Sequence, residues 1–232
     1  MNISIIACKT TEDEIKQALR ITETEYPICW IESGLHNYPD QLKTRLQQTI
    51  DEIGNSDYIL LLFGLCGNAM LGLKSRRASL VIPKVDDCIS LFLGGNHNRR
   101  KMENTARAYY LTRGWLRYEN NIWQEYQRSI REYGLAKTRR LFGVMLKHYT
   151  HLVVIDTGAY KMDNFFEECR EIAAELNLDL QVVPGDLTLL NKALLPEWDD
   201  HFTIIKPGRE VTLRDMDTCK NLLNDSISFK VS

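Results

Sequence analysis

The sequence lacks long apolar runs and shows no excess of charge of one sign. No run approaches the roughly 20 apolar residues that a membrane helix needs, so we expect no membrane span. Lys plus Arg number 29 and Asp plus Glu number 31, and no basic stripe stands out, which argues against a nucleic-acid partner. The apolar start, residues 1–8, is short and has no basic residues, so it predicts a buried strand and no secretory signal. These absences together predict a cytoplasmic protein.

The sequence also lacks closely spaced cysteines. Its six cysteines include no Cys-x-x-Cys pair, so no local loop brings two metal ligands together. A cytoplasmic chain keeps its cysteines reduced, and they then serve as thiols or metal ligands and not as a disulfide framework. A metal site in this chain has to be assembled by the fold, from residues that lie far apart in the sequence.

The sequence does contain a regular alternation of two patterns. Short apolar runs bounded by Gly or Pro predict strands, and between them apolar residues recur at helical spacing. The strands are expected at residues 3–7, 26–31, 57–63, 79–83, 108–112, 151–156, 180–183 and 202–205. Helices are expected after Thr10 or Thr11 and at residues 39–53, 69–74, 89–93, 119–149 (with a break at Gly134), 163–176 and 187–195.

This alternation is typical of an α/β fold with three layers and a mostly parallel, Rossmann-like sheet. We expect one α/β domain over residues 1–232. A division into two pseudo-halves, joined near residues 115–150, is compatible with the same pattern.

Potential metal ligands follow four consecutive predicted strands. Cys8 follows the first, His36 the second, Cys66 the third and Cys88 the fourth. The carboxyl ends of the strands in an open α/β sheet are where ligands bind. Thiolates with imidazole suit zinc, and thiolates alone suit an iron–sulfur cluster. Core packing explains any single cysteine better, but for Cys66 and Cys88 together a functional site is slightly favoured.

The turn at residues 64–68 has a second interpretation. Gly64 and Gly67 let backbone N–H groups approach an anion, and a helix N-terminus there lowers the pKa of the Cys66 thiol. Cys66 is then a nucleophile, alone or in addition to its role as a ligand, and His36 could lie close to it in space. Gly64, Gly67 and Asn68 are accordingly candidate cofactor contacts.

Carboxylates follow the fourth predicted strand directly. Asp87 could orient a ligand or accept a proton from His36. A helix N-cap with an acidic first turn is the alternative, and it explains Asp86 equally well but Asp87 less well.

Further along the chain, Gly114–Trp115 and Tyr109–Tyr110 are candidates for the aromatic wall of a pocket. For the two tyrosines, core packing is the better explanation. Asp156 and Thr157 end a later strand, which we expect at the same sheet edge. They either contact a substrate there or form a simple turn.

The remaining cysteines are not expected to bind a metal. Cys29 lies inside a predicted strand, Cys169 in the middle of a helix and Cys219 in a polar terminal helix. These positions are typical of packing.

Four segments carry a resemblance to a known family: residues 64–68, 81–88, 110–115 and 155–158. Together with Cys8, the Leu35–His36 pair and Pro39, they resemble the family called domain of unknown function 1638, found in bacteria and methanogenic archaea. The likeness runs from Cys8 to about Gly208. One departure is Asp86, where many members are expected to have His, and this weakens any role for position 86. Genes of that family often lie beside corrinoid-dependent methyltransferases, which implies a setting in anaerobic one-carbon metabolism.

The expected function is that of a metalloenzyme acting on a small molecule. Zinc or an iron–sulfur centre is held by Cys8, Cys66 and Cys88, with His36 or an open position as the fourth ligand, and Cys66, His36 and Asp87 are the candidate catalytic residues. Methyl transfer to a thiol or a corrinoid is the most concrete reaction, and a corrinoid protein or a methyltransferase is the implied partner. Three alternatives stay open: an iron–sulfur lyase or dehydratase, an accessory carrier of metal or corrinoid, and a metal-free thiol enzyme that uses Cys66.

Overall fold

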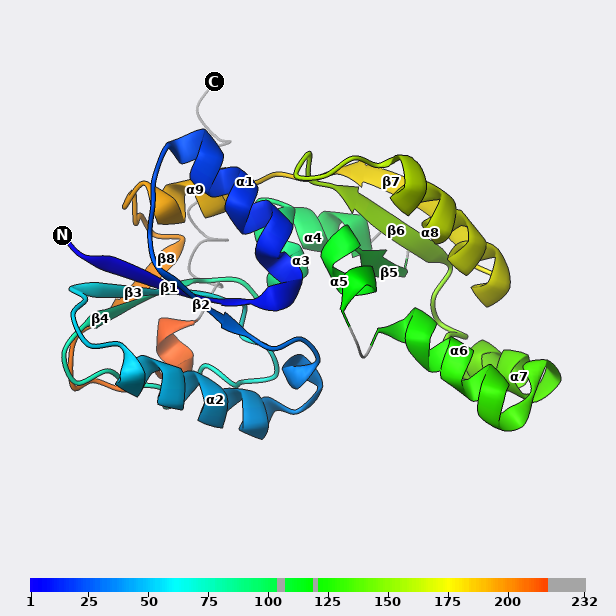
Figure 1. Ribbon diagram of the computed structural model, residues 1–232, viewed down its shortest axis with the longest axis horizontal. Coiled ribbons are helices and arrows are strands. Elements are labelled where there is room, and N and C mark those ends of the chain that lie inside the picture. The colour runs from blue at the N-terminus through cyan, green and yellow to red at the C-terminus, as the bar shows by residue number, and fades with distance from the viewer. Residues whose placement is uncertain (104–106, 119–120, 217–232) are drawn as a thin grey trace, which may run out of the picture.

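A computed structural model describes residues 1–103, 107–118 and 121–216, and the strands of this part of the chain form two sheets (Figure 1). The first sheet has five strands in the order β2-β1-β3-β4-β8, and the second has three in the order β5-β6-β7. The strands are β1 Ile3–Cys8, β2 Ile28–Ile31, β3 Tyr58–Leu62, β4 Ser79–Pro83, β5 Ala108–Leu111, β6 His151–Asp156, β7 Asp179–Pro184 and β8 Phe202–Ile205. All paired strands are parallel except β8, which runs antiparallel to β4.

The helices connect these strands and cover both faces of the first sheet. They are α1 Glu12–Thr22, α2 Pro39–Glu52, α3 Cys88–Phe92, α4 Asn96–Glu103, α5 Arg113–Arg117, α6 Ile122–Tyr133, α7 Leu135–Met145, α8 Asp163–Leu176 and α9 Thr188–Leu194. Helices α1 and α9 lie on one side of the first sheet, and α2 lies on the other (Figure 1). Helices α6 and α7 form a hairpin at the far end of the molecule (Figure 1).

Alternating side chains of the buried strands create these layers. In β1, Ile3 and Ile5 belong to the apolar cluster under α1 and α9, whereas Ile6 belongs to the cluster under α2. Successive side chains of a strand point to opposite faces, so a strand that is apolar at every position is covered on both sides. The predicted three-layer, mostly parallel α/β architecture is confirmed.

The second sheet shares one of these clusters with the first. Val153 and Ile155 of β6 pack in the same cluster as Ile5 of β1. The alternate residues Leu152 and Val154 pack under α8. One continuous apolar layer therefore joins the two sheets.

The division into two sheets corrects one expectation from the sequence. Strand β8 pairs with the free edge of β4. Strand β5 therefore cannot pair with β4 and extend the first sheet. Asp156, which ends β6, and Thr157, which follows it, therefore belong to the second sheet and its connection and not to the edge where Cys8 and Cys66 lie.

Some local predictions also need correction. The helix expected at residues 69–74 is a series of turns, because three neighbouring residues, 66–68, have positive φ. Helix α5, which was not predicted from the sequence, begins at Arg113, directly after the strand expected at residues 108–112. The break at Gly134 is confirmed, since α6 ends at Tyr133 and α7 begins at Leu135. Cys219 lies outside the described residues, and the single domain with a division near residues 115–150 stays a prediction.

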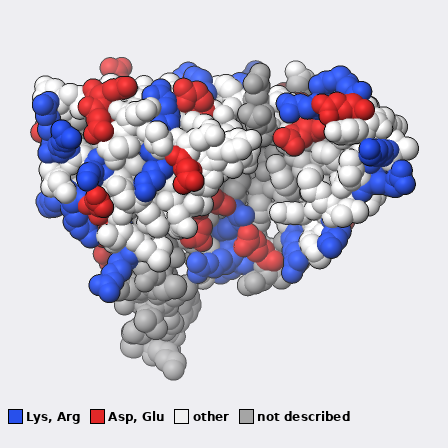
Figure 2. All heavy atoms as spheres, turned by 90° about the horizontal axis from the view of Figure 1, so that it is seen from below, with Lys and Arg blue, Asp and Glu red and all other residues white. Residues whose placement is uncertain are grey.

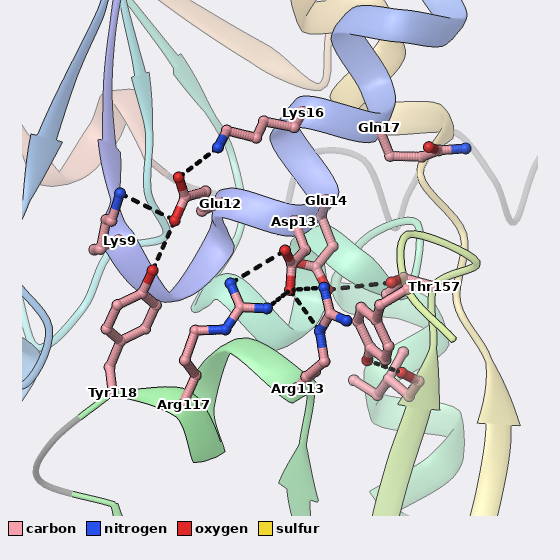
Figure 3. A network of polar contacts seen from close by, with 12 residues as sticks. Lys9, Glu12, Asp13, Glu14, Lys16, Gln17, Arg113, Arg117, Tyr118 and Thr157 are labelled. Carbon is pink, nitrogen blue, oxygen red and sulfur yellow. Dashed lines mark hydrogen bonds and ion pairs between the residues drawn. The ribbon is translucent and has the colours of Figure 1, made fainter. Parts of the chain in front are cut away.

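A polar network joins the first turn of α1 to the second half of the chain (Figure 3). Asp13 accepts ion pairs from Arg113 at 2.9 Å and from Arg117 at 3.0 Å. Glu14 is fully buried and accepts a hydrogen bond from the Thr157 hydroxyl at 3.1 Å, while its other carboxylate oxygen has no partner in the described part of the chain. Carboxylates at a helix N-terminus are stabilised by the helix dipole. The network therefore fixes how the second sheet packs on α1.

A close backbone approach at Gly114 reinforces this junction. A Cβ added to Gly114 would lie 1.8 Å from the carbonyl oxygen of Thr10. Only glycine permits this distance, and the contact sets α5 directly against the residues that follow β1. Trp115 is positioned by the same contact.

Two global features of the described residues, apolar helices and surface charge, agree with the composition of the sequence. No helix in the described part of the chain is long and apolar enough to cross a bilayer. On the face seen in Figure 2, acidic and basic side chains are interspersed, and neither gathers into one extended patch.

Replacing Gly114 by alanine should destabilise the protein by about 2–3 kcal/mol, since the added methyl group overlaps the backbone of Thr10. The matched control is Gly143→Ala in α7, where an added Cβ meets nothing within 4 Å and the helix should gain up to about 1 kcal/mol. Urea unfolding of the two variants beside wild type measures both effects. Equal stability of the two variants would contradict the close approach.

The buried Glu14 should make stability depend on pH near neutrality. Burial, with a smaller contribution from the Asp13 charge, raises the pKa of Glu14 to about 7. Stability is then highest below pH ~4.5, falls as pH rises towards 7, and stays reduced above 7, by up to about 3 kcal/mol. Glu14→Gln removes this loss, so the variant should be more stable than wild type at pH 8, and the difference should shrink towards pH 5.

The measurement is the urea midpoint at several pH values, with the exposed Glu171→Gln as control. Parallel pH profiles for wild type and Glu14→Gln would show that Glu14 is ionised in the native protein throughout this range.

Candidate functional site

A cavity of about 310 Å³ opens at the carboxyl ends of β1, β3 and β4, and its lining includes Cys8, His36, Cys66 and Cys88. It lies where the strand order reverses, because β1 is followed in sequence by β2 on one side and by β3 on the other. Helices α1 and α2 cover opposite faces there. In open α/β sheets this reversal leaves a crevice in which ligands bind. The four residues predicted as metal ligands from the sequence therefore line one cavity.

Two adjacent turns bring Cys66 and Cys88 together. A Cβ on Gly64 would lie 2.3 Å from the Cα of Asp87, so the turn after β3 packs directly on the turn after β4. The Leu65 N–H donates to the Val85 carbonyl at 3.0 Å, and the Cys66 N–H donates to the Asp86 carbonyl at 3.3 Å. These contacts continue the ladder between the two strands past their ends, and they bring the Cys66 thiol close enough to that of Cys88 to raise the pKa of Cys88.

The backbone of Cys66 is in an unusual conformation. Its φ is 45°, and the next residues, Gly67 and Asn68, have φ of 64° and 73°. A non-glycine residue in this left-handed region costs free energy of order 1 kcal/mol or more, and such residues cluster at functional sites. A Cβ at Gly67 would lie 2.9 Å from Pro39, which fixes the turn against the start of α2. The strain thus presents Cys66 at the cavity.

Cys8 and Cys88 are thiols that resist ionisation. Burial, followed by the nearby Cys88, raises the pKa of Cys8 to about 11, although the Thr10 hydroxyl contacts its Sγ at 3.0 Å. The hydrogen bond with Cys66 and burial raise the pKa of Cys88 well above its usual value. Both side chains are neutral near pH 7 unless a cation lies beside them.

His36 lies at the mouth of the cavity, on the short 3₁₀ turn Leu35–Asn37 that follows Gly34. Its side chain is exposed on one side, and partial burial lowers its pKa. A neutral imidazole can bind a metal ion or accept a proton.

Asp87 has a structural role in this arrangement. One of its carboxylate oxygens caps α3 by accepting from the Ser90 N–H at 2.8 Å, and the other accepts from Arg99 at 2.8 Å. The capping alternative thus accounts for Asp87, although it also lines the cavity. Its catalytic role stays a prediction. Asp86 is exposed and pairs with Arg100 at 3.6 Å.

The other predicted contacts are divided between two places. Gly67 and Trp115 line the cavity, whereas Gly64 is not among the lining residues and makes the close contact with Asp87. Asn68 is exposed in the adjoining turn. Asp156 and Thr157 do not line this cavity: the Asp156 carboxylate accepts from the Gly158 N–H at 3.1 Å, and the Thr157 hydroxyl donates to Glu14.

Several other residues line the cavity. Tyr109 and Tyr110, for which a pocket wall was the less favoured alternative to core packing, are both among them. The lining residues with no earlier assignment include Thr10, Glu32, Phe63 and Asn121. Thr10 and Phe63 could have been found, because each lies within three residues of a predicted strand end. Asn121 could not, since it comes from the second half of the chain.

The lining thiols do not form a ready metal cage. In the part of the chain that the structure describes, no group of three or more His, Cys, Asp or Glu side chains is arranged to hold a metal ion. Binding a metal at Cys8, Cys66 and Cys88 would therefore require the side chains to move as their protons leave.

Comparison with protein families gives one match, to the family described as protein of unknown function DUF1638, over residues 30–194. The match covers more than half of the 232 residues. The chain belongs to this family. The region matched to the DUF1638 family contains His36, Cys66 and Cys88, and it begins after Cys8. The comparisons with curated proteins and with solved structures gave no match.

The surroundings of the thiols predict an order of alkylation by iodoacetamide at pH 7.5. Cys66 is half-buried and should react first, whereas Cys8 and Cys88 are buried and have raised pKa values. For Cys8 the thiolate fraction should be about one hundredth of that of an ordinary thiol. Peptide mapping by mass spectrometry of chelator-treated protein measures the three rates, and urea-unfolded protein, in which they should be similar, is the control. Faster modification of Cys8 than of Cys66 would contradict this arrangement.

Proposed function

We propose that the chain is an enzyme that acts on a small molecule in the cavity, next to a metal ion held by Cys66, Cys88 and Cys8. The observation that carries the proposal is that Cys8, Cys66 and Cys88 line one cavity, with Cys66 close enough to Cys88, and Cys88 close enough to Cys8, to raise the pKa of the neighbouring thiol. Three cysteines from three different strand ends meet in one cavity at the position where α/β sheets bind ligands.

The chemistry of these donors favours a thiophilic metal ion. Buried thiols in an apolar cavity are costly to ionise, and a bound divalent cation is the usual compensation, because a coordinating thiol is deprotonated outright. Zinc is the first choice, since it accepts sulfur and imidazole ligands together, and His36 lies at the same cavity. An iron–sulfur centre is the alternative if only the thiolates bind.

Methyl transfer is the reaction class we propose for this site. Cys8, Cys66 and Cys88 would hold the metal and leave one position open, and the metal would there stabilise the thiolate of a substrate thiol, whose proton would be released to water. The sulfur lone pair then forms the new carbon–sulfur bond as the bond between the methyl carbon and its donor breaks, and the donor leaves with that electron pair. The gene neighbourhood implied by the family resemblance supports a corrinoid protein or a methyltransferase as the donor or partner, in the cytoplasm.

The size of the cavity limits how a corrinoid could take part. At about 310 Å³ it is at the lower end of ligand pockets, so it suits a small substrate and not an entire macrocyclic cofactor. A corrinoid would therefore approach the mouth of the cavity on its own protein. An accessory carrier and an iron–sulfur lyase or dehydratase remain the alternatives from the sequence.

The pairing of the thiols also supports a second candidate, a metal-free thiol enzyme. Cys66 is half-buried and held in a strained backbone conformation, and the Cys88 thiol lies next to it. In this case Cys66 is the nucleophile and no metal is required.

Metal analysis of anaerobically purified protein separates the two candidates. We expect about one zinc per chain in wild type, and loss of most of it in Cys66→Ala and in Cys88→Ala, because each removes one thiolate ligand. The matched control is Cys169→Ala, which alters a fully buried cysteine of α8 outside the cavity and should keep its zinc.

The other outcomes have equally definite meanings. Brown protein that contains iron and sulfide would favour the cluster. Folded wild type without any metal, together with loss of activity on Cys66 alkylation, would leave the metal-free enzyme. Equal metal content in all four proteins would show that the metal binds elsewhere.

A further inference from the structure

The charged side chains that line the cavity do not favour an anionic ligand, which is unusual for a metabolic enzyme. The charged side chains in its described lining are those of Glu32 and Asp87, and neither Lys nor Arg is among these lining residues. Phosphate and carboxylate groups are normally recognised by Arg, Lys or free backbone N–H groups. An anion here would instead approach two carboxylates.

Both carboxylates are already paired with cations outside the lining. Asp87 binds Arg99, whose guanidinium group lies 4.5 Å from the centre of the Tyr110 ring. Glu32 pairs with Arg45 at 3.4 Å, and its side chain is 64% exposed. Neither carboxylate therefore offers an unpaired, desolvated charge that would bind a cation strongly.

Two of the neutral polar side chains of the wall, Asn121 and Thr10, are engaged, whereas the buried Tyr110 hydroxyl has no hydrogen-bond partner in the described part of the chain and can meet an uncharged polar group of a ligand. The Asn121 amide donates to the carbonyls of Leu116 and Tyr118 and accepts from the Gln124 N–H. The Thr10 hydroxyl contacts Cys8. Much of the remaining wall is apolar or aromatic, with Leu42, Phe63, Ile89, Tyr109, Tyr110 and Trp115.

We infer that the ligand of this cavity is an uncharged small molecule with an apolar body, and that the site excludes phosphorylated, carboxylate and ammonium ligands. The inference rests on the proposed function only in taking this cavity as the ligand site. The inference is carried by the composition of the wall and by the ion pairs that Glu32 and Asp87 each make with an arginine. A metal bound by three thiolates would not add positive charge. Nucleotides and acyl phosphates are excluded as substrates by the same reasoning.

Three probes with one ring and different charge test the inference: benzyl alcohol, benzoate and benzylammonium. Binding is followed by saturation-transfer NMR and by protection of Cys66 from iodoacetamide, which reports on occupation of this cavity. We expect benzyl alcohol to bind at least about tenfold more tightly than either ion, equivalent to about 1.4 kcal/mol. Equal or tighter binding of either ion would overturn the inference, and so would the absence of saturable binding of all three.

A pair of matched variants tests the role of charge directly. Leu35 lines the cavity and is half-buried, so Leu35→Lys places a cation at the wall and should improve benzoate binding about fivefold or more. Leu195→Lys makes the same change at a side chain that is 44% exposed and lies outside the cavity, and it should have no effect. If benzoate binding changed equally in the two variants, the charge of the cavity wall would not be what selects the ligand.

The probe experiment also separates this inference from the proposed function. It is run on wild-type protein before and after removal of metal with a chelator. Selection for benzyl alcohol that persists without metal supports the inference even if metal analysis disproves the metalloenzyme. Zinc bound by the cysteines together with preference for benzoate would support the metalloenzyme and overturn the inference.

Discussion

The contact between the backbones of Gly64 and Asp87 is the constraint on which the site depends. A Cβ at position 64 would lie 2.3 Å from the Cα of Asp87, so the two turns can approach this closely only with glycine there. The approach allows hydrogen bonds from Leu65 and Cys66 to the turn after β4. The two thiols meet as a result, although 21 residues separate Cys66 from Cys88 in the sequence (88 − 66 − 1).

The same turn explains why Asp87 has so many partners. Its carboxylate caps α3 and binds Arg99, and its backbone is in close contact with Gly64. By binding Arg99, which packs on Tyr110, it keeps a guanidinium group out of the lining of the cavity. The electrostatic character of the cavity and the position of the thiols therefore depend on one residue.

The sequence predicted the individual elements well, because each depends on local patterns. The boundaries of α8 and the break at Gly134 follow from helical spacing and from glycine, and strand ends located Cys8, His36, Cys66 and Cys88. Which strands pair was not predictable, because pairing depends on contacts between distant segments. The antiparallel return of β8 divides the strands between two sheets, and Asp156 and Thr157 moved away from the site for that reason. Asn121 and the tyrosines of β5 came to the cavity through the same long-range packing.

The position of β8 has a consequence for how the chain folds during synthesis. Its partners in the first sheet lie within residues 3–83, yet β8 itself is formed by Phe202–Ile205. While the ribosome makes the intervening residues, the edge of β4 has unpaired N–H and C=O groups, which can pair with another chain. The second sheet needs only residues 108–184 and can pair its strands earlier. Nascent chains stalled before residue 202 would therefore expose the edge of the sheet that carries the cysteines, and aggregation should be most severe at those lengths.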